Sequence, residues 1–164
     1  MYGTLFQGDP TTVLDATPRM TPGALVRTVD GKTYKYVKFI AESVAAVAGA
    51  PAFWSDTDST YSDTFVTADY SECMTDTPND ARGIFVSVPV AATPWCFIQT
   101  WGYNSAVVND GTDLSIGVLL VASGDGVCTV YTLTGNSQTP YRTVGYVAEA
   151  TSATSGKVML TLER

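Results

Sequence analysis

The sequence predicts a mainly β protein, an antiparallel β-barrel or β-sandwich preceded by an extended N-terminal arm. From Gly83 onward, short runs rich in Val, Ile, Thr and aromatic residues are separated by turn residues, as at Asn109-Asp110-Gly111. No segment shows the length and the 3.6-residue periodicity of a convincing helix. The first 22 residues carry three prolines and no sustained periodicity, which is typical of an extended segment.

The length of 164 residues indicates one domain with a single core. We expect residues 1–22 to form the arm and residues 23–164 to form a single β domain. Charged residues make up 15% of the chain, below the roughly 25% usual for soluble domains. Such a surface suits a protein interface, whose centre is depleted of Lys, Glu and Asp. A Thr-rich β protein without any interface explains the same composition.

The arm carries apolar side chains that need a surface to pack on. Such a segment either wraps its own domain or lies on a neighbouring molecule, and the sequence leaves both open. The arm residues expected at an interface are Tyr2, Leu5, Phe6, Val13 and Leu14.

The stretch "GALVRTVDGKTYKYVKFI" predicts a β-hairpin. Two β-rich runs flank Asp30-Gly31, a dipeptide favoured in type I′ turns because both central positions need positive φ. In the second run Val37 and Phe39 alternate with the tyrosines and Lys38, so one face of this strand is expected to be apolar. The following "AESVAAVAGAPAFW" predicts a turn or a short helix that ends before an "AFW" strand, because Gly49 and Pro51 break helices.

The rest of the chain reads as short strands. "DTFVTAD" predicts a strand and "MTDTPNDARG" a long polar loop. The further expected strands are "GIFVSVPV", "WCFIQTWG", "SAVVND", "SIGVLLVAS", "GVCTVYTL", "TVGYVAEA" and "KVMLTLE". The last strand either pairs inside its own barrel or leaves an edge for a neighbouring subunit.

Charge and composition argue against several classes of partner. The formal net charge is −7, and the nine basic residues are scattered, so the sequence predicts no binding to nucleic acid or to an anionic membrane. No apolar run approaches the roughly 20 residues that a membrane-spanning helix needs. The start, "MYGTLFQGDP", does not resemble a secretory signal. Cys73, Cys96 and Cys128 are expected to be free buried thiols in a chain made in a reducing cytoplasm.

The sequence predicts no catalytic residue and no cofactor. It contains no histidine, the commonest general base and a frequent metal ligand. The glycine-rich "ASGDGVC" lacks the spacing of a phosphate-binding loop. A hydrolase with paired carboxylates would need Glu149 opposed by Glu42 or Glu72, a pairing for which the sequence offers no reason.

One acidic stretch is a candidate for a bound cation. In "DTDSTYSD" the carboxylates of Asp56, Asp58 and Asp63 are closely spaced, as in a Ca²⁺ loop. The stretch lacks the glycine and the terminal glutamate of an EF-hand, and Asp and Ser are common in solvated turns. We therefore expect no metal site here, with Ca²⁺ as the alternative.

Aromatic residues crowd the segment "WCFIQTWGY". Strand alternation places Trp95, Phe97, Gln99 and Trp101 on one face, with Cys96 and Ile98 on the other. The aromatic side chains then form a core, a protein interface at Trp101 and Tyr103, or a platform on which Trp95, Trp101 or Tyr103 stacks a glycan. Core packing is the ordinary role for such residues.

Three stretches of the chain carry a resemblance to a known family. They are "GALVRTVDGKTYKYVKF", "WCFIQTWGYNSAVVNDGTDLSIGVLLVASGDGVC" and "VGYVAEATSATSGKVMLTLER". Their order of β-hairpins resembles the decoration, or cement, proteins of tailed-bacteriophage heads, whose domain is of the β-tulip kind. The sequence departs from the family pattern at residues 146–150 and in the acidic insertion at residues 56–80.

The resemblance implies a structural role without enzymatic activity. A decoration protein binds the mature head and stabilises it by mass action, since it binds only the assembled shell. The implied partners are the major capsid protein and further copies of the chain in a dimer or trimer. The implied location is the outer surface of the virion capsid, after synthesis in the host bacterial cytoplasm. The alternative is a glycan- or receptor-binding β module of a phage fibre or a cell surface.

Overall fold

The computed structural model describes residue 6 and residues 8–55, 64–71, 81–132, 143–151 and 154–162. The fold is mainly β, as the sequence predicts. The described residues form eleven strands and no α-helix. Their one helical turn is the 3-10 turn η1, Pro10–Thr12, which Asp9 caps by accepting a hydrogen bond from the backbone N of Thr11.

Five strands close into a barrel in the order β3-β5-β4-β6-β7, because β7 pairs back with β3. Their bounds are β3 Thr33–Phe39, β4 Pro51–Trp54, β5 Phe65–Thr67, β6 Ala81–Phe85 and β7 Trp95–Val108. The barrel is mixed, which corrects the expected antiparallel arrangement. β3 and β5 run parallel, whereas the other four neighbouring pairs are antiparallel. A closed ring of five strands cannot have antiparallel neighbours throughout, so one pair must be parallel.

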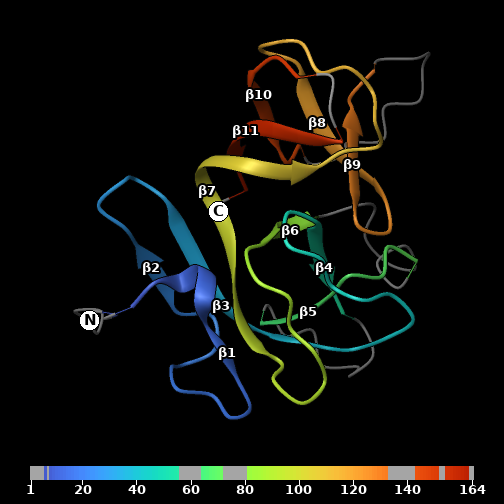
Figure 1. Cartoon of the computed structure of the whole chain (residues 1–164). Coiled ribbons are helices and arrows are strands. Elements are labelled where there is room, and N and C mark those ends of the chain that lie inside the picture. Colours follow the sequence, from blue (N-terminus) through green and yellow to red (C-terminus); the bar gives the residue numbers. More distant parts are fainter. Residues whose placement is uncertain are drawn as a thin grey trace.

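The strand β7 leaves the barrel and continues into a second sheet, in the order β7-β11-β10-β8-β9 (Figure 1). The bounds of its other strands are β8 Leu119–Gly124, β9 Val127–Val130, β10 Gly145–Glu149 and β11 Ser155–Thr161. The two strands predicted at "WCFIQTWG" and "SAVVND" are thus one strand. The final strand, β11, lies between β7 and β10, so it pairs inside its own sheet and is not an edge.

The described arm packs on its own domain. Its strand β1, Leu14–Asp15, pairs with the start of β7 through Leu14↔Cys96 and Asp15↔Trp95. The phenyl ring of Phe6 meets that of Phe97 edge-on, with centroids 5.1 Å apart. The sequence left open whether the arm packs on its own domain or on a neighbouring molecule, and the described arm residues pack on their own domain.

The predicted hairpin is present, with a different turn. β2, Leu25–Arg27, pairs with β3, and the backbone N of Thr28 donates to the carbonyl of Lys32 across the loop. Three residues, 29–31, therefore lie between Thr28 and Lys32, instead of the two of a type I′ turn. Gly31 has φ 81°, the left-handed conformation that a three-residue hairpin loop needs at this position.

Both faces of β3 are buried, although the sequence predicted one apolar face. Val37 and Phe39 point into the barrel, whereas Tyr34 and Tyr36 point outward and are covered by the arm. Between β3 and β4 the described residues form turns and irregular structure, so the short helix considered for "AESVAAVAGA" is absent there.

Three apolar clusters form the core. One fills the barrel and contains Val37, Phe39, Ala46, Ala50, Ala52, Val66, Ala68, Phe85, Cys96 and Ile98. A second lies under the arm and contains Val13, Tyr34, Tyr36, Trp95 and Phe97. The third joins the outer side of β4 and β6 to the second sheet, with Phe53, Ile84, Val107, Leu120, Val147, Val158 and Leu160 among its members. This third cluster and the continuous strand β7 join the barrel to the second sheet.

Candidate functional site

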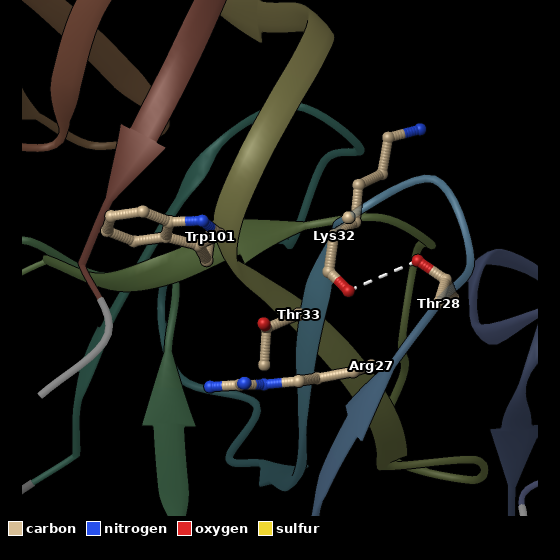
Figure 2. Close-up of a pocket in the computed structure, with 6 residues that line it drawn as sticks. Arg27, Thr28, Lys32, Thr33 and Trp101 are labelled. Carbon is tan, nitrogen blue, oxygen red and sulfur yellow. Dashed lines mark hydrogen bonds between the residues drawn. The ribbon is translucent and has the colours of Figure 1, made fainter.

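A groove of about 470 Å³ lies where β7 leaves the barrel for the second sheet. We call it the Trp101 groove; it is lined by Arg27, Thr28, Gly31, Lys32, Thr33 and Trp101. Arg27 lies directly opposite Thr33 in the β2–β3 pair, and Thr33 lies opposite Trp101 in the β3–β7 pair. Figure 2 shows the Thr33 hydroxyl between the guanidinium of Arg27 and the indole of Trp101. Three neighbouring strands thus bring three different donor groups together.

The backbone around Trp101 is held by a buried amide. The side chain of Gln99 is buried, and its Nε2 donates to the carbonyl oxygens of Trp101 and Tyr103, each at 3.1 Å. Its Oε1 accepts from Nδ2 of Asn104 at 3.0 Å. Gly102, within β7, has φ 90°, a left-handed conformation that glycine adopts without a steric cost. The indole of Trp101, 43% exposed, is therefore presented on a fixed backbone.

Two cationic residues, Arg27 and Lys32, line the groove, and their side chains extend in different directions. Nζ of Lys32 lies 2.9 Å from Oδ2 of Asp30, outside the groove lining. Hydrogen bonds from Thr28 and then from Lys32 lower the pKa of Asp30 to about 2, so this carboxylate stays ionised. In Figure 2 the amine of Lys32 points away from Trp101, whereas the guanidinium of Arg27 extends beneath it.

A second feature is a row of apolar side chains across the outer face of the second sheet, which we call the outer row. Cross-strand pairing places Leu119 opposite Tyr146, Tyr146 opposite Met159, and Met159 opposite Tyr103. Tyr131 extends the row, because its backbone N donates to the carbonyl of Leu119 at 2.8 Å. Leu119 and Tyr146 are 43% and 42% exposed. No described element covers these two side chains.

The charges beside the outer row neutralise each other. Nζ of Lys157 lies 2.6 Å from Oε2 of Glu149, and the Tyr103 hydroxyl donates to Oε1 of Glu149 at 3.0 Å. These hydrogen bonds, that of Lys157 first, hold the pKa of Glu149 below its usual value. A general acid needs a raised pKa, so Glu149 does not have the environment of a general acid.

The sequence-predicted interface residues fall in different environments. Val13 is buried in its own domain, and Phe6 is partly buried against Phe97, so the fold itself uses these two side chains. Leu14 is 38% exposed at the edge of the barrel. Trp101 lines the groove and Tyr103 stands in the outer row. Tyr2 and Leu5 lie outside the described residues.

The three aromatic candidates for a glycan platform lie in different environments. The predicted alternation is confirmed for Trp95 and Phe97, which lie in the cluster under the arm, and for Cys96 and Ile98, which lie in the barrel. It does not extend to Trp101, because the β3–β7 register shifts there: Tyr34 lies opposite Gln99, and the adjacent Thr33 lies opposite Trp101. Trp95 is buried and stacked on Tyr36, with ring centroids 5.7 Å apart and planes inclined by 18°, so it is a core residue. The Tyr103 hydroxyl is engaged by Glu149. Trp101 is the one of the three with an open ring face.

The other candidate chemical groups do not converge. Asp56, Asp58 and Asp63 lie outside the described residues, as do Glu72 and Cys73. Elsewhere in the described chain, no group of three or more His, Cys, Asp or Glu residues is placed to hold a metal ion. Glu42 accepts a hydrogen bond from Ser55 at 3.0 Å, near the barrel, whereas Glu149 lies on the second sheet. The structure does not bring these two carboxylates together as a pair.

Sequence reasoning missed Arg27 and the outer row. In the sequence Arg27 is one of nine scattered basic residues, and only the β2–β3 register places it opposite Thr33. The outer row depends on register as well, since its members come from five separate segments. Alternation within β8 and β10 does point Leu119 and Tyr146 away from Leu120 and Val147, and that signal was available in the sequence.

Among the described residues there is no helix long and apolar enough to cross a membrane. The chain matches no family model, no curated protein and no solved structure.

Proposed function

We propose that this protein is a capsid decoration protein of a tailed bacteriophage, which binds the outer surface of the mature head and stabilises it. The outer row is its contact with the major capsid protein. The observation that carries the proposal is the exposure of Leu119 and Tyr146 in the middle of a regular sheet. The resemblance of three stretches of the sequence to decoration proteins supports the choice of a phage head as the partner.

The physical basis is the composition of the outer row within an acidic chain. The protein carries a net charge of −7, yet the outer row is uncharged and its neighbouring Lys157 and Glu149 form an ion pair. Covering such a face removes apolar area from water without burying an unpaired charge. Tyr and Met are also enriched in protein interfaces relative to the remaining surface. Several copies in a dimer or trimer would add their contacts on a symmetric shell.

The test uses heads from the phage that encodes the chain, with and without its gene. Purified protein is mixed with the deficient heads, and bound protein is measured by sedimentation. We expect saturable binding and a higher temperature of DNA release from the decorated heads. Leu119→Asp places a charge in the outer row, and binding would bury this charge without a partner. We therefore expect binding to weaken at least about tenfold, which corresponds to about 1.4 kcal/mol.

The matched control is Leu25→Asp. Leu25 is also an exposed leucine on a strand, at 53%, but it lies on β2 at the opposite end of the strand order from β8. We expect Leu25→Asp to bind heads like the wild type. If deficient heads release DNA at the normal temperature and the wild-type protein does not sediment with them, the proposal is wrong. If both variants bind equally well, the outer row is not the contact.

Recognition of a glycan by a fibre or cell-surface module is the second candidate function. The observation that favours it is the open face of Trp101 beside the Arg27 guanidinium. Glycan recognition would use Arg27 and Trp101, whereas head binding would use Leu119 and Tyr146. Substitutions at Arg27 or Trp101 should therefore affect only glycan binding, and substitutions at Leu119 or Tyr146 only head binding.

A further inference from the structure

We infer that the turn between β8 and β9, at Asp125 and Gly126, is a site of spontaneous isoaspartate formation in the folded protein. The chain contains three Asp-Gly sequences, at residues 30–31, 110–111 and 125–126. The contacts of the glycine nitrogen and of the carboxylate set the third sequence apart from the other two. The inference does not depend on binding to phage heads or to a glycan.

The reaction is an attack of the glycine backbone nitrogen on the side-chain carboxyl carbon of the preceding aspartate. A bond forms between this nitrogen and Cγ, the nitrogen gives up its proton and the carboxyl group gives up its hydroxyl, so one water molecule leaves. A water molecule from the solvent then opens the resulting succinimide ring at either carbonyl, which restores aspartate or leaves isoaspartate. No oxidant or reductant takes part. Glycine favours the first step because it has no Cβ beside the attacking nitrogen and its backbone is the least restricted.

The glycine nitrogen is engaged in two of the three sequences. The N–H of Gly31 donates to the carbonyl of Thr28 at 3.1 Å. The N–H of Gly111 donates to Oδ1 of Asn109 at 2.8 Å. Each nitrogen must leave its acceptor before it can turn toward Cγ, so the loss of a hydrogen bond adds to the barrier at these two sites.

The nitrogen of Gly126 is not engaged in this way. Gly124 pairs with Val127, so Asp125 and Gly126 form a two-residue hairpin loop, and Gly126 has a positive φ of 72°, as Asp-Gly loops of this kind require. In such a loop the flanking residues make the hairpin hydrogen bonds. The N–H of Gly126 accordingly donates to no group in the described part of the chain. This nitrogen can approach Cγ without breaking a contact.

The carboxylates at the other two sites are held in their ionised form. Hydrogen bonds from Thr28 and then from Lys32 lower the pKa of Asp30 to about 2. Hydrogen bonds, that of Thr129 first, hold the pKa of Asp110 below its usual value. Loss of water requires the protonated carboxyl group, so these contacts slow the reaction at both residues.

The carboxylate of Asp125 is less restrained. Asp125 is exposed, and its Oδ1 accepts a hydrogen bond from the backbone N of Tyr70 at 2.7 Å. Isoaspartate adds a CH₂ group to the main chain and replaces the side-chain carboxylate with the former backbone carboxyl group. A two-residue loop lengthened in this way would not keep the pairing of Gly124 with Val127, and Tyr70 would lose its acceptor. We therefore expect hydrogen exchange at Tyr70 and Val127 to become faster as isoaspartate accumulates.

The test is incubation of the full folded chain in H₂¹⁸O at neutral pH and physiological temperature over several weeks. Each opening of the succinimide inserts one ¹⁸O atom, and isoaspartate is detected with protein L-isoaspartate methyltransferase and located by peptide mass spectrometry. We expect isoaspartate to form at residue 125 at least about tenfold faster than at residues 30 and 110, the factor that corresponds to one or two hydrogen bonds. In urea, where these contacts are absent, the three sites are expected to react at similar rates.

Two variants separate the site from the explanation, and circular dichroism reports that each is folded. Asp125→Glu keeps the carboxylate but disfavours the ring, and it is expected to abolish ¹⁸O incorporation at residue 125 and to leave the other sites unchanged. Thr28→Val removes the main hydrogen bond to Asp30 and is expected to raise the rate at residue 30 severalfold. Equal rates at the three sites of the folded chain, a faster reaction at residue 30 or 110, or no isoaspartate at residue 125 would overturn the inference. An unchanged rate at residue 30 in Thr28→Val would overturn the explanation through the carboxylate contacts.

Discussion

The hydroxyl of Tyr36 on β3 donates a hydrogen bond to Oδ2 of Asp15 on β1, with the oxygens 3.0 Å apart. Asp15 also forms an ion pair with Arg19, and the backbone N of Arg19 donates to the same Tyr36 hydroxyl at 3.3 Å. These contacts tie the arm to the barrel at its most buried tyrosine, which has no exposed surface. The arm is therefore part of the folded domain, held by polar contacts as well as by Phe6 and Val13.

Replacing Tyr36 with phenylalanine removes the hydroxyl and keeps the ring. We expect the free energy of unfolding to fall by about 1 to 3 kcal/mol, because a charged acceptor loses a partly buried donor. Urea unfolding measures this change. Tyr146→Phe is the control, since this tyrosine is 42% exposed, and its stability is expected to stay within about 0.5 kcal/mol of the wild type. Equal effects of the two variants would contradict the role of the Tyr36–Asp15 bond.

The same tyrosine predicts a loss of stability in alkali. Burial, as the main cause, raises the pKa of Tyr36 from 10.0 to about 12. The folded state therefore keeps a proton that the unfolded state releases, so this stabilisation is complete below pH 10 and is lost as the pH rises toward about 12. Urea unfolding at a series of pH values is expected to show the decline. Tyr36→Phe should show a shallower decline, and an unchanged slope would refute the assignment to Tyr36.

Phe6 tests whether the arm stabilises its own domain. Phe6→Ala removes the edge-on contact with Phe97, and we expect a loss of about 1 to 2 kcal/mol from the lost apolar burial and ring contact. Hydrogen exchange is expected to become faster at residues 8–22. Leu14→Ala, at a more exposed arm position, is expected to change stability by less than about 0.5 kcal/mol. An unaffected Phe6→Ala protein would mean that the arm contributes little to the isolated domain.

Two glycines with the same backbone angle separate a steric clash from backbone strain. Gly49 and Gly111 both have φ 89°, but a Cβ on Gly49 would lie 2.0 Å from the carbonyl oxygen of Ala106, whereas one on Gly111 meets nothing within 4 Å. Gly111→Ala is expected to cost about 1 to 2 kcal/mol from the left-handed conformation alone. Gly49→Ala is expected to cost at least about 3 kcal/mol, because β7 must move away. Thermal unfolding compares the two, and equal losses would contradict the close approach.

The buried cysteines are expected to resist modification in the folded protein. Burial raises the pKa of both Cys96 and Cys128 to about 12, so neither is a thiolate near neutral pH. In a Cys73→Ser variant, a disulfide reagent at pH 8 is expected to label no thiol in buffer and two in urea. Rapid labelling in buffer would show that the barrel or the second sheet opens readily.

Local patterns in the sequence were enough for most of the strands. Alternation correctly separated Trp95 and Phe97 from Cys96 and Ile98 at the start of β7, and the loop around Gly31 was correctly placed as the turn of a hairpin. The predicted common face of Gln99 and Trp101 was wrong, because the β3–β7 register shifts between them. The turn type was wrong because the hydrogen bond from Thr28 to Lys32 leaves three residues in the loop. The length of β7 was also missed, because Gly102 reads as a turn residue although here it lies within a paired strand.

The mixed barrel and both candidate surfaces depend on contacts between distant segments. The parallel pairing of Lys38 with Phe65 joins β3 to β5, although β4 lies between these two strands in the chain, and no local sequence pattern encodes this pairing. The aromatic pattern of the sequence pointed to Trp101 but not to Arg27. Arg27 comes near Trp101 because both residues are paired with Thr33, one on each neighbouring strand.

By itself, the chain's alternation of apolar and polar residues determined that this protein is built from strands, because side chains two apart share a face whatever the partner strand is. Only the tertiary structure decided which strands are neighbours, and with them where the arm packs, that Trp95 is buried and that Arg27 and Trp101 lie on either side of Thr33. The physical reason is that these outcomes follow from the free energy of bringing remote segments into register, which depends on the whole core and not on any one stretch of residues.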